Sequence, residues 1–565
     1  MRASETRGPW LERLFALGCG LARSGLLLLA FGNSSFWWAG LLAPLPLVLL
    51  AAKASRPLRS GVWFGVGASV FWGISHRWAA AISELGFPGM VIHFAVLEWL
   101  LIALIVRLRE GMPRLPWCLV APAGWTAGEV FRGEVLWSGY PWFLAGHPMI
   151  EWWPMAAPAA WLGVYSVSFL VVAISGSLMD AIEHRTRAAA AGGLAALAAW
   201  GLSWGLASPP GGGGSIRVGI VQTNLPQDNK SAWTMEDRLI DWQRFERLTL
   251  QAATERPEVI AWPETMFPGV FLDPVRRLDE EAQVEFVPAN FFVGDLIALQ
   301  ERIGVPMLVG AIGTEGLRTR ETIENGRVVE RLEHDREFNS VFLLHEGAVR
   351  ARYDKIHLTP FGEVMPLISR WAWLESKLLA LGARGMSFGL SEGPRAPGAT
   401  RPEVRPGVRV ATPICFEVGD ASLCRGLVFQ AGERRAEVLM NLTNDGWFVG
   451  VDLMRRAAVR TSRWRCVELA TPMARSANTG ISCLIDARGR VLARGTPSGD
   501  ARVDGTLVGD LPLGTGSTLY ARIGDAFAWV VLAGVLFACA LPRRVWRSPG
   551  RGNADNTANH AAASA

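Results

Sequence analysis

The alternation of apolar and polar positions divides the chain into regions of different character. Residues 1–207 are apolar runs separated by short polar breaks, and residues 216–520 alternate strand-like and helix-like patterns with ordinary charge content. Residues 524–541 are apolar again, and residues 548–565 are small and polar. We therefore predict a membrane domain of seven helices, an α/β domain, a final membrane helix and a disordered tail. The segment SPPGGGGS at 208–215 is the linker between the first two, because Gly and Ser runs do not pack a core.

The apolar runs predict about eight membrane-spanning helices, since a helix needs about 20 apolar residues to cross a bilayer. One of these runs, LPWCLVAPAGWTAGEVF, is short and interrupted by proline. An even number of spans puts both chain ends on the same side of the membrane. The predicted spans begin near Leu11, Ser35, Gly61, Phe87, Leu115, Met155, Ala188 and Gly524.

Basic residues between the runs indicate the orientation, because Lys and Arg accumulate on the inner side of a membrane. All five segments on the side of the N-terminus are basic, whereas the opposite loops are poorer in Arg and richer in aromatic residues, as in WSGYPWF at 137–143. The α/β domain is therefore predicted to lie outside. The basic residues are Arg2, Arg7 and Arg13; Lys53, Arg56 and Arg59; Arg107, Arg109 and Arg114; Arg185 and Arg187; and Arg543, Arg544 and Arg547.

Composition supports this division and excludes some classes of protein. The chain has 565 residues, of which 50% are hydrophobic, so it is too long for one ordinary domain and too apolar for most soluble proteins. The net charge of +5 is not concentrated in a Lys/Arg-rich block with interleaved aromatics, so we predict no nucleic-acid partner. The basic, apolar start lacks a clear cleavage site and predicts a retained helix.

The seven cysteines form no CxxC pair, so neither a metal site nor a disulfide framework is predicted. The outer domain contains Cys424, Cys466 and Cys483 as well as Cys415. In an oxidising compartment a disulfide among them is possible. A buried free thiol is the default for Cys466, which lies in a helical pattern.

The outer domain alternates predicted strands with helices, which is typical of an α/β fold. A helical pattern covers 237–253, and FLLHEGAVRARY and CLIDARGRVLARG are typical of hairpins with a glycine in the turn. The predicted strands are 216–222, 258–264, 306–313, 341–346, 408–417 and 437–444.

Chemically versatile residues follow three of these strands. Glu264 follows a strand in AWPETMFP, Lys355 and Glu363 lie in RYDKIHLTPFGEVMP, and Cys415 ends the strand in VRVATPICFEVGD. Each has an ordinary alternative explanation: a solvated loop carboxylate, a charged hairpin arm, or a buried inert thiol. Together, a carboxylate, an ammonium and a thiol at strand ends supply a base, an electrostatic stabiliser and a nucleophile.

Two further features of these segments bear on the thiol. A helix that begins at Cys415 and an ammonium such as that of Lys355 both favour the thiolate. Glu417, two residues after the cysteine, either orients its neighbours or caps that helix.

The order Glu264, Lys355, Cys415, followed by NLTNDGWF (441–448) and RSANTGISCLID (475–486), resembles the nitrilase (carbon–nitrogen hydrolase) superfamily. Together with the membrane helices, the chain resembles the apolipoprotein N-acyltransferases. The segments that carry this resemblance are SGYPWF, GVYSVSFL, VQTNLPQ, PFGEVMP and TLYARIGD.

The resemblance implies a four-layer αββα sandwich attached to eight membrane helices in the bacterial inner membrane, with the catalytic domain on the periplasmic side. It implies transfer of an acyl chain from a phospholipid donor to the N-terminal cysteine of a diacylated apolipoprotein acceptor, without a cofactor or metal. By the same resemblance, Cys415 is the nucleophile, Glu264 the general base and Lys355 the oxyanion stabiliser. Glu363 and Glu417 are supporting carboxylates.

Three departures from the family pattern stand out. Phe416, whose backbone N–H the resemblance places in the oxyanion site, stands where the pattern more often has Tyr. Extra residues precede Trp233, which the resemblance makes a substrate-facing tryptophan. The charged stretch 267–336 is interpreted as an insertion, either a solvated excursion or a lid or partner surface.

Other interpretations stay open. A membrane-tethered amidase or nitrilase would use water as the second substrate. A non-catalytic lipoprotein-binding scaffold would not need the intact triad, and a transporter would need more mid-membrane charge than residues such as Glu98 supply. The aromatic residues Trp137, Tyr140, Trp142 and Phe267 either line an acyl path or, as we favour from sequence, anchor the chain at the membrane interface.

Overall fold

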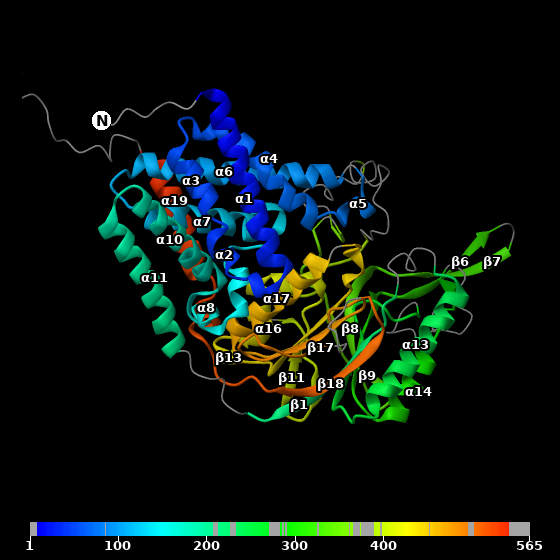
Figure 1. Ribbon diagram of the computed structural model, residues 1–565. Helices are drawn as coiled ribbons and strands as arrows, with labels where there is room; N and C mark the ends of the chain where they lie inside the picture. The colour runs from blue at the N-terminus through cyan, green and yellow to red at the C-terminus, as the bar shows by residue number, and fades with distance from the viewer. Residues whose placement is uncertain are drawn as a thin grey trace, which may run out of the picture.

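The computed structural model describes residues 8–84, 86–206, 213–225, 233–269, 283–284, 287–288, 291–324, 327–360, 362–364, 373, 389–395, 398–450, 452–494 and 502–541. The predicted tail 548–565 and residues 208–212 of the predicted linker lie outside this part of the chain. The described chain forms a helical bundle joined to a body of two β-sheets (Figure 1).

Apolar helices form the bundle at one end of the molecule. Among the described helices, four are long and apolar enough to cross a membrane: α1, α6, α10 and α11. The predicted count of eight is therefore not confirmed. The bundle helices are α1 (Pro9–Gly32), α2 (Ala39–Leu42), α3 (Leu45–Lys53), α4 (Pro57–Ser75), α5 (Ala79–Ile82), α6 (Gly86–Gly111), α7 (Trp117–Val130), α8 (Trp153–Ala156), α9 (Ala159–Leu162), α10 (Val164–Ile182), α11 (Thr186–Leu206) and α19 (Ala526–Ala540).

Two of the predicted spans are not single continuous α-helices. The span predicted near Ser35 is divided into α2 and α3 around Pro44, and proline has no N–H to continue a helix. The span predicted near Leu115 begins as α7 at Trp117 and ends in a π-helical turn over Phe131–Val135.

Two six-stranded sheets form the body. The first has the order β18-β1-β2-β5-β8-β9 and the second β10-β11-β14-β15-β16-β17. In each sheet three central strands run parallel, so their carboxyl ends lie at one edge. The strands are β1 (Ser215–Gln222), β2 (Val259–Ala261), β5 (Met307–Glu315), β8 (Arg336–His345), β9 (Ala348–Asp354), β10 (Glu403–Arg405), β11 (Val408–Ala411), β14 (Val438–Thr443), β15 (Met473–Ala477), β16 (Cys483–Ile485), β17 (Val491–Arg494) and β18 (Gly505–Pro512).

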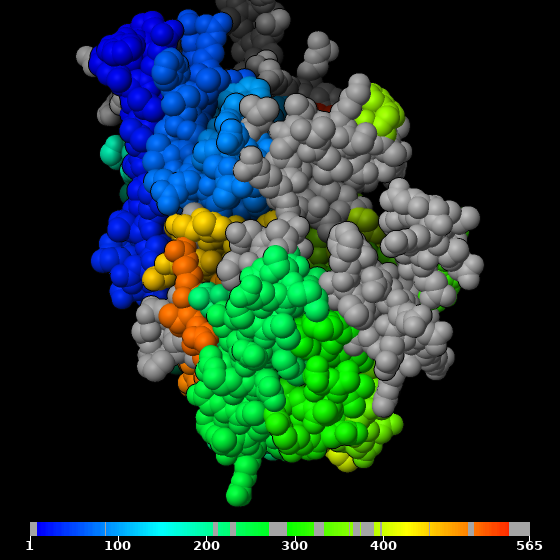
Figure 2. All heavy atoms as spheres, turned by 90° about the vertical axis from the view of Figure 1, so that its right-hand side faces the viewer, coloured from blue at the N-terminus to red at the C-terminus, as the bar shows by residue number. Residues whose placement is uncertain are grey.

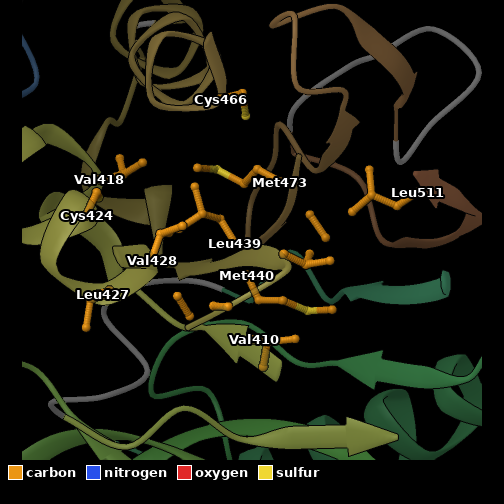
Figure 3. Close-up of a cluster of buried hydrophobic side chains, with 14 of the residues drawn as sticks. Val410, Val418, Cys424, Leu427, Val428, Leu439, Met440, Cys466, Met473 and Leu511 are labelled. Carbon is orange, nitrogen blue, oxygen red and sulfur yellow. The ribbon is translucent and has the colours of Figure 1, made fainter. Parts of the chain in front are cut away.

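Helices cover the outer face of each sheet, which gives four layers. Helices α13 (Met235–Ala253) and α14 (Val293–Ile303) pack on the first sheet, and Figure 2 shows them (green) on one face of the molecule. Helices α16 (Ala421–Val428) and α17 (Asp452–Leu469) pack on the second. The close-up in Figure 3 shows the second sheet's core, where successive β14 residues Leu439 and Met440 point to opposite faces. The four-layer αββα arrangement that the resemblance implies is thus present.

The prediction that 267–336 is an insertion is wrong for its central part. Helix α14 and strand β5 belong to the core of the first sheet, because their apolar faces are buried there. The hairpin of β6 (Arg318–Glu324) and β7 (Arg327–Glu333) projects from the body and forms a small sheet with β3 (Gln283–Val284) and β4 (Val287–Pro288).

The cysteines of the outer domain are unpaired. Cys424, Cys466 and Cys483 are all buried free thiols, so they form no disulfide with one another. Cys424 and Cys466 fill the layer between the second sheet and its helices (Figure 3). They act there as small apolar side chains.

Helix α17 joins the sandwich to the bundle through buried ion pairs. Glu151 of the bundle lies 2.9 Å from the Arg460 Nε and 2.5 Å from the Arg463 Nη1. Arg463 also donates to the Ile150 carbonyl at 2.9 Å. Two guanidinium groups on one helix are therefore fixed by one carboxylate of the membrane unit.

Glu151→Gln is expected to lower the free energy of unfolding by about 3–5 kcal/mol, because it leaves two buried guanidinium groups without their counter-charge. Thermal unfolding of the purified protein in detergent measures the effect. Glu433→Gln is the matched control: its pair with Arg435 is exposed, with 39% and 71% side-chain exposure, and should contribute less than about 1 kcal/mol. Equal effects of the two substitutions would contradict the interpretation.

Candidate active site

Glu264 lies directly after β2, at the carboxyl edge of the first sheet, and is 5% exposed. Its Oε1 accepts a hydrogen bond from the Asn339 Nδ2 at 2.7 Å, and its Oε2 accepts one from the Asn444 backbone N–H at 2.8 Å. Asn444 follows β14 of the second sheet. The carboxylate is thus held between the two sheets, and it is not the solvated loop residue of the alternative explanation.

Lys355 follows β9 and is completely buried, with its ammonium between two carboxylates. Its Nζ lies 2.6 Å from the Glu363 Oε2 and 3.4 Å from the Glu264 Oε1. Burial alone would lower the pKa of Lys355, but the charges of Glu363 and Glu264 outweigh it and raise the pKa above its ordinary value. The side chain is therefore a fixed cation at this edge.

Glu363 completes the group. Its Oε2 also accepts the backbone N–H of Thr359 at 2.8 Å, and its Oε1 accepts the Asn339 Nδ2 at 3.1 Å. Burial opposes ionisation of Glu363, but the ammonium of Lys355 and these hydrogen bonds lower its pKa below the ordinary value. Glu363 is thus the second counter-charge of Lys355.

Cys415 stands where the chain leaves β11 and enters a short 3-10 helix, Cys415–Gly419. Its backbone φ of 51° lies in the left-handed region, which few residues other than glycine adopt. Burial raises the pKa of the Cys415 thiol to about 12, helped by the charge of Glu264 and only partly opposed by Lys355. Lys355 lowers the pKa of the Cys415 thiol, as expected, but desolvation raises it by more, so the thiolate is not favoured in the resting protein.

Glu417 positions both the lysine and the cysteine segments. Its Oε1 accepts the backbone N–H of Ile356, next to Lys355, at 2.6 Å, and its Oε2 accepts the N–H of Ile414, next to Cys415, at 2.6 Å. Burial raises the pKa of Glu417 to about 7. Of the two roles predicted for Glu417, capping and orienting, the carboxylate thus performs both.

Asn339 is a site residue that the sequence analysis missed. It lies within β8, and its Nδ2 bridges the carboxylates of Glu264 and Glu363. A single Asn inside an apolar strand was a usable signal, because a buried amide needs hydrogen-bond partners. Asn444, from NLTNDGWF, was noted only as part of a motif.

Phe416 connects the site with the helical bundle. Its ring lies 6.5 Å from that of Trp142 and 5.7 Å from that of His357. Trp142 is 4% exposed and packs in a cluster with Tyr140, whose ring lies 6.4 Å away. The prediction that Trp142 anchors the chain at the membrane interface is therefore wrong.

The other aromatic residues considered with Trp142 lie elsewhere. Phe267 is 3% exposed in the core of the first sheet, so it does not anchor the chain at an interface, whereas Trp137 is 39% exposed. Trp233 donates its Nε1–H to Asp241 at 2.8 Å and lies under the guanidinium of Arg238. Trp233 thus packs against α13, and its predicted substrate contact stays untested.

Alkylation of Cys415 is expected to be slow at neutral pH. Because its thiol pKa is raised to about 12, the rate with iodoacetamide should keep rising with pH, without the plateau that an ordinary thiol shows above a pKa of about 8.5. Mass spectrometry of the Cys415 peptide measures the rate, and Cys415→Ala gives the background. A plateau near neutral pH would contradict the raised pKa.

Chemically, the group offers a thiol, a buried carboxylate and a fixed ammonium at the facing edges of two sheets. This set can take a proton from sulfur and stabilise an oxyanion. Within the described part of the chain, no three His, Cys, Asp or Glu side chains are grouped as metal ligands.

Comparison with known proteins gives the family. Residues 24–177 match the apolipoprotein N-acyltransferase N-terminal domain, and residues 217–519 match the carbon-nitrogen hydrolase domain. The chain is 31% identical over 557 residues to the apolipoprotein N-acyltransferase of Caulobacter vibrioides, covering 94% of this chain and 95% of that protein. This chain belongs to the apolipoprotein N-acyltransferase family.

Further similarities extend across most of the chain. The apolipoprotein N-acyltransferase of Bradyrhizobium diazoefficiens is 29% identical over 519 residues, 86% of each protein. A solved amidase of the nitrilase superfamily from Nesterenkonia AN1 is 16% identical, covers 57% of this chain and 98% of its own, and gives a TM-score of 0.35. The resemblance noted in the sequence is confirmed, and the chain is an acyltransferase whose setting is the membrane and whose reaction is lipoprotein N-acylation.

Proposed function

We propose that this apolipoprotein N-acyltransferase moves an acyl chain from a phospholipid, through a thioester on Cys415, to the N-terminal amine of a diacylglyceryl-cysteine lipoprotein. The observation that carries the proposal is the buried Glu264–Lys355–Glu363 group at the sheet edge to which β11 brings Cys415. Phe416 and Trp142 link this edge to the bundle, as a donor drawn from a bilayer requires.

In the first half-reaction, Glu264 takes the thiol proton as the Cys415 sulfur attacks the ester carbonyl carbon. A base is needed because the resting thiol, with its pKa near 12, is neutral. The ammonium of Lys355 and the backbone N–H of Phe416 stabilise the oxyanion. When the C–O bond breaks, Glu264 returns the proton to the leaving alkoxide, and a lysophospholipid departs from the thioester.

In the second half-reaction, the lipoprotein amine attacks the thioester carbonyl and Glu264 takes a proton from its nitrogen. The C–S bond breaks, the proton passes to the sulfur, and the Cys415 thiol is restored. The lysophospholipid leaves before the amine enters, so ping-pong kinetics are expected. Glu363 keeps Lys355 in place, and Glu417 aligns the two segments.

The membrane arrangement is part of the proposal. Eight spans would place both chain ends inside and the catalytic domain, residues 216–520, on the periplasmic side of the bacterial inner membrane. The alternation of basic and aromatic loops supports this orientation. The domain limits 1–207 and 524–541 for the membrane segments follow from the same pattern.

The decisive experiment mixes the full-length protein in detergent with a phospholipid and a diacylated lipopeptide that carries a free N-terminal Cys. Mass spectrometry should show one added acyl chain on the peptide and, without the peptide, one on Cys415. Release of free fatty acid only, or turnover of amide substrates with ammonia as product, would support the amidase alternative instead. No acyl-enzyme and no product would overturn the proposal.

A further inference from the structure

Arg132 is a buried cation that forms no ion pair with the described residues. It lies in the π-helical turn that follows α7 and is 9% exposed. Within the described part of the chain, its Nη1 is buried and has no hydrogen-bond partner. Its guanidinium carbon lies 5.6 Å from the centre of the Trp72 ring, which is a cation–π contact. Burying such a group is costly unless something pairs with it.

The charges of Glu129 and Glu98 act on Arg132, but neither carboxylate forms an ion pair with it in the described part of the chain, and the Glu129 Oε2 is itself buried without a hydrogen-bond partner there. Glu129 Oε1 accepts the Trp125 Nε1–H at 2.9 Å and the Ala145 N–H at 2.7 Å. Glu98 forms a buried ion pair with Arg23 at 2.9 Å. These carboxylates act on the charge of Arg132 from a distance, and its buried Nη1, one arm of the planar N–H fork, donates to neither of them. Such a fork matches the oxygens of a phosphate or carboxylate.

The position of Arg132 connects it with the nucleophile. Its carbonyl accepts the backbone N–H of Tyr140 at 2.9 Å. The Tyr140 ring lies 6.4 Å from that of Trp142, which lies 6.5 Å from that of Phe416, the neighbour of Cys415. The indole N–H of Trp142 is also buried without a partner in the described structure. Two buried donors without partners in the described structure, the Arg132 Nη1 and the Trp142 Nε1, therefore belong to residues that both contact Tyr140, and Trp142 also contacts Phe416 beside the thiol.

We propose that Arg132 binds the phosphate of the phospholipid acyl donor, while the Trp142 indole N–H donates to an ester oxygen of the same molecule. The inference rests on the proposed function and adds how the donor is recognised. A phospholipid carries its phosphate and its acyl esters on one glycerol, so one molecule can meet both donors. A neutral ester lipid would lack the Arg132 contact.

The test compares two donors with the same acyl chains, a phosphatidylethanolamine and a diacylglycerol, in single-turnover acylation of Cys415. Arg132→Gln should lower the rate with the phospholipid about tenfold or more, the size expected for a lost charge-assisted hydrogen bond, and leave the diacylglycerol rate unchanged. Arg59→Gln, an exposed arginine of the same unit, is the matched control and should change neither rate. Equal losses with both donors, or no loss with either, would overturn the proposal.

A second measurement needs no variant that could misfold. Glycerol 3-phosphate should inhibit acylation of the wild-type protein competitively with the phospholipid, and glycerol should not. Absence of this difference would overturn the proposal. If the variant loses co-purified phospholipid while both donors slow equally, the phosphate belongs to a structural lipid and the donor assignment is wrong.

The outcomes separate this inference from the function it rests on. If the wild-type protein forms no acyl-enzyme on Cys415 with either ester, the proposed function itself fails. If both esters acylate Cys415 at rates that Arg132→Gln does not change, only the assignment of Arg132 fails.

Discussion

Lys355→Met is expected to abolish acyl transfer and to destabilise the protein. The substitution removes the ammonium that lies 2.6 Å from Glu363 and 3.4 Å from Glu264, and leaves two buried carboxylates without a counter-charge. The free energy of unfolding should fall by about 3–5 kcal/mol, as when one partner of a buried pair is lost. Turnover should fall by about 100-fold or more, because an oxyanion stabiliser is lost.

The two effects of Lys355→Met can be separated by a second substitution. Adding Glu363→Gln removes one of the uncompensated charges, so stability should partly recover while activity should not. Lys53→Met, an exposed lysine of the bundle, is the matched control and should change neither quantity. Thermal unfolding and the lipopeptide acylation assay measure the two effects. Recovery of activity in the double variant would show that Lys355 acts only on the fold.

The stability difference between Lys355→Met and the wild type should also depend on pH. Burial raises the pKa of Glu363, but Lys355 lowers it more, so the net pKa lies below the ordinary value of 4.5. A lowered carboxyl pKa stabilises the fold above the ordinary value, and this stabilisation is lost as pH falls through the folded-state pKa. The difference in free energy of unfolding between the wild type and Lys355→Met should therefore become smaller as the pH falls below the ordinary carboxyl pKa. Unfolding measured at a series of pH values across that range would show this.

Cys415→Ala is expected to abolish acyl transfer with little change in stability. Without the sulfur no thioester forms, so neither the acyl-enzyme nor the acylated lipopeptide should appear. The substitution removes a single neutral sulfur atom, so the free energy of unfolding should change by about 1 kcal/mol or less. Cys539→Ala, in α19, is the matched control. Acylated peptide produced by Cys415→Ala at the wild-type rate would show direct transfer without a covalent intermediate.

Local sequence patterns were enough to predict several strands of the outer domain and the positions of the reactive residues. Strands predicted at 216–222 and 437–444 are found as β1 and β14, because alternation of side chains along a strand is a local property. Glu264, Lys355 and Cys415 were predicted at strand ends for the same reason. The long apolar helices were also predictable, since length and hydropathy are properties of a continuous segment.

The contacts of these residues, by contrast, depend on the tertiary structure. Asn339 donates hydrogen bonds to Glu264 and Glu363, which lie in segments far apart in the chain. A local sequence pattern does not show that these segments meet. Desolvation in the folded protein, rather than the helix start, has the largest effect on the pKa of Cys415. The stretch 267–336 looked like an insertion because its charged hairpin dominates its composition, whereas the apolar face of β5 is recognised only once the neighbouring strands cover it. Contacts, solvation and long-range charge arise from packing, and packing is not a local property of the sequence.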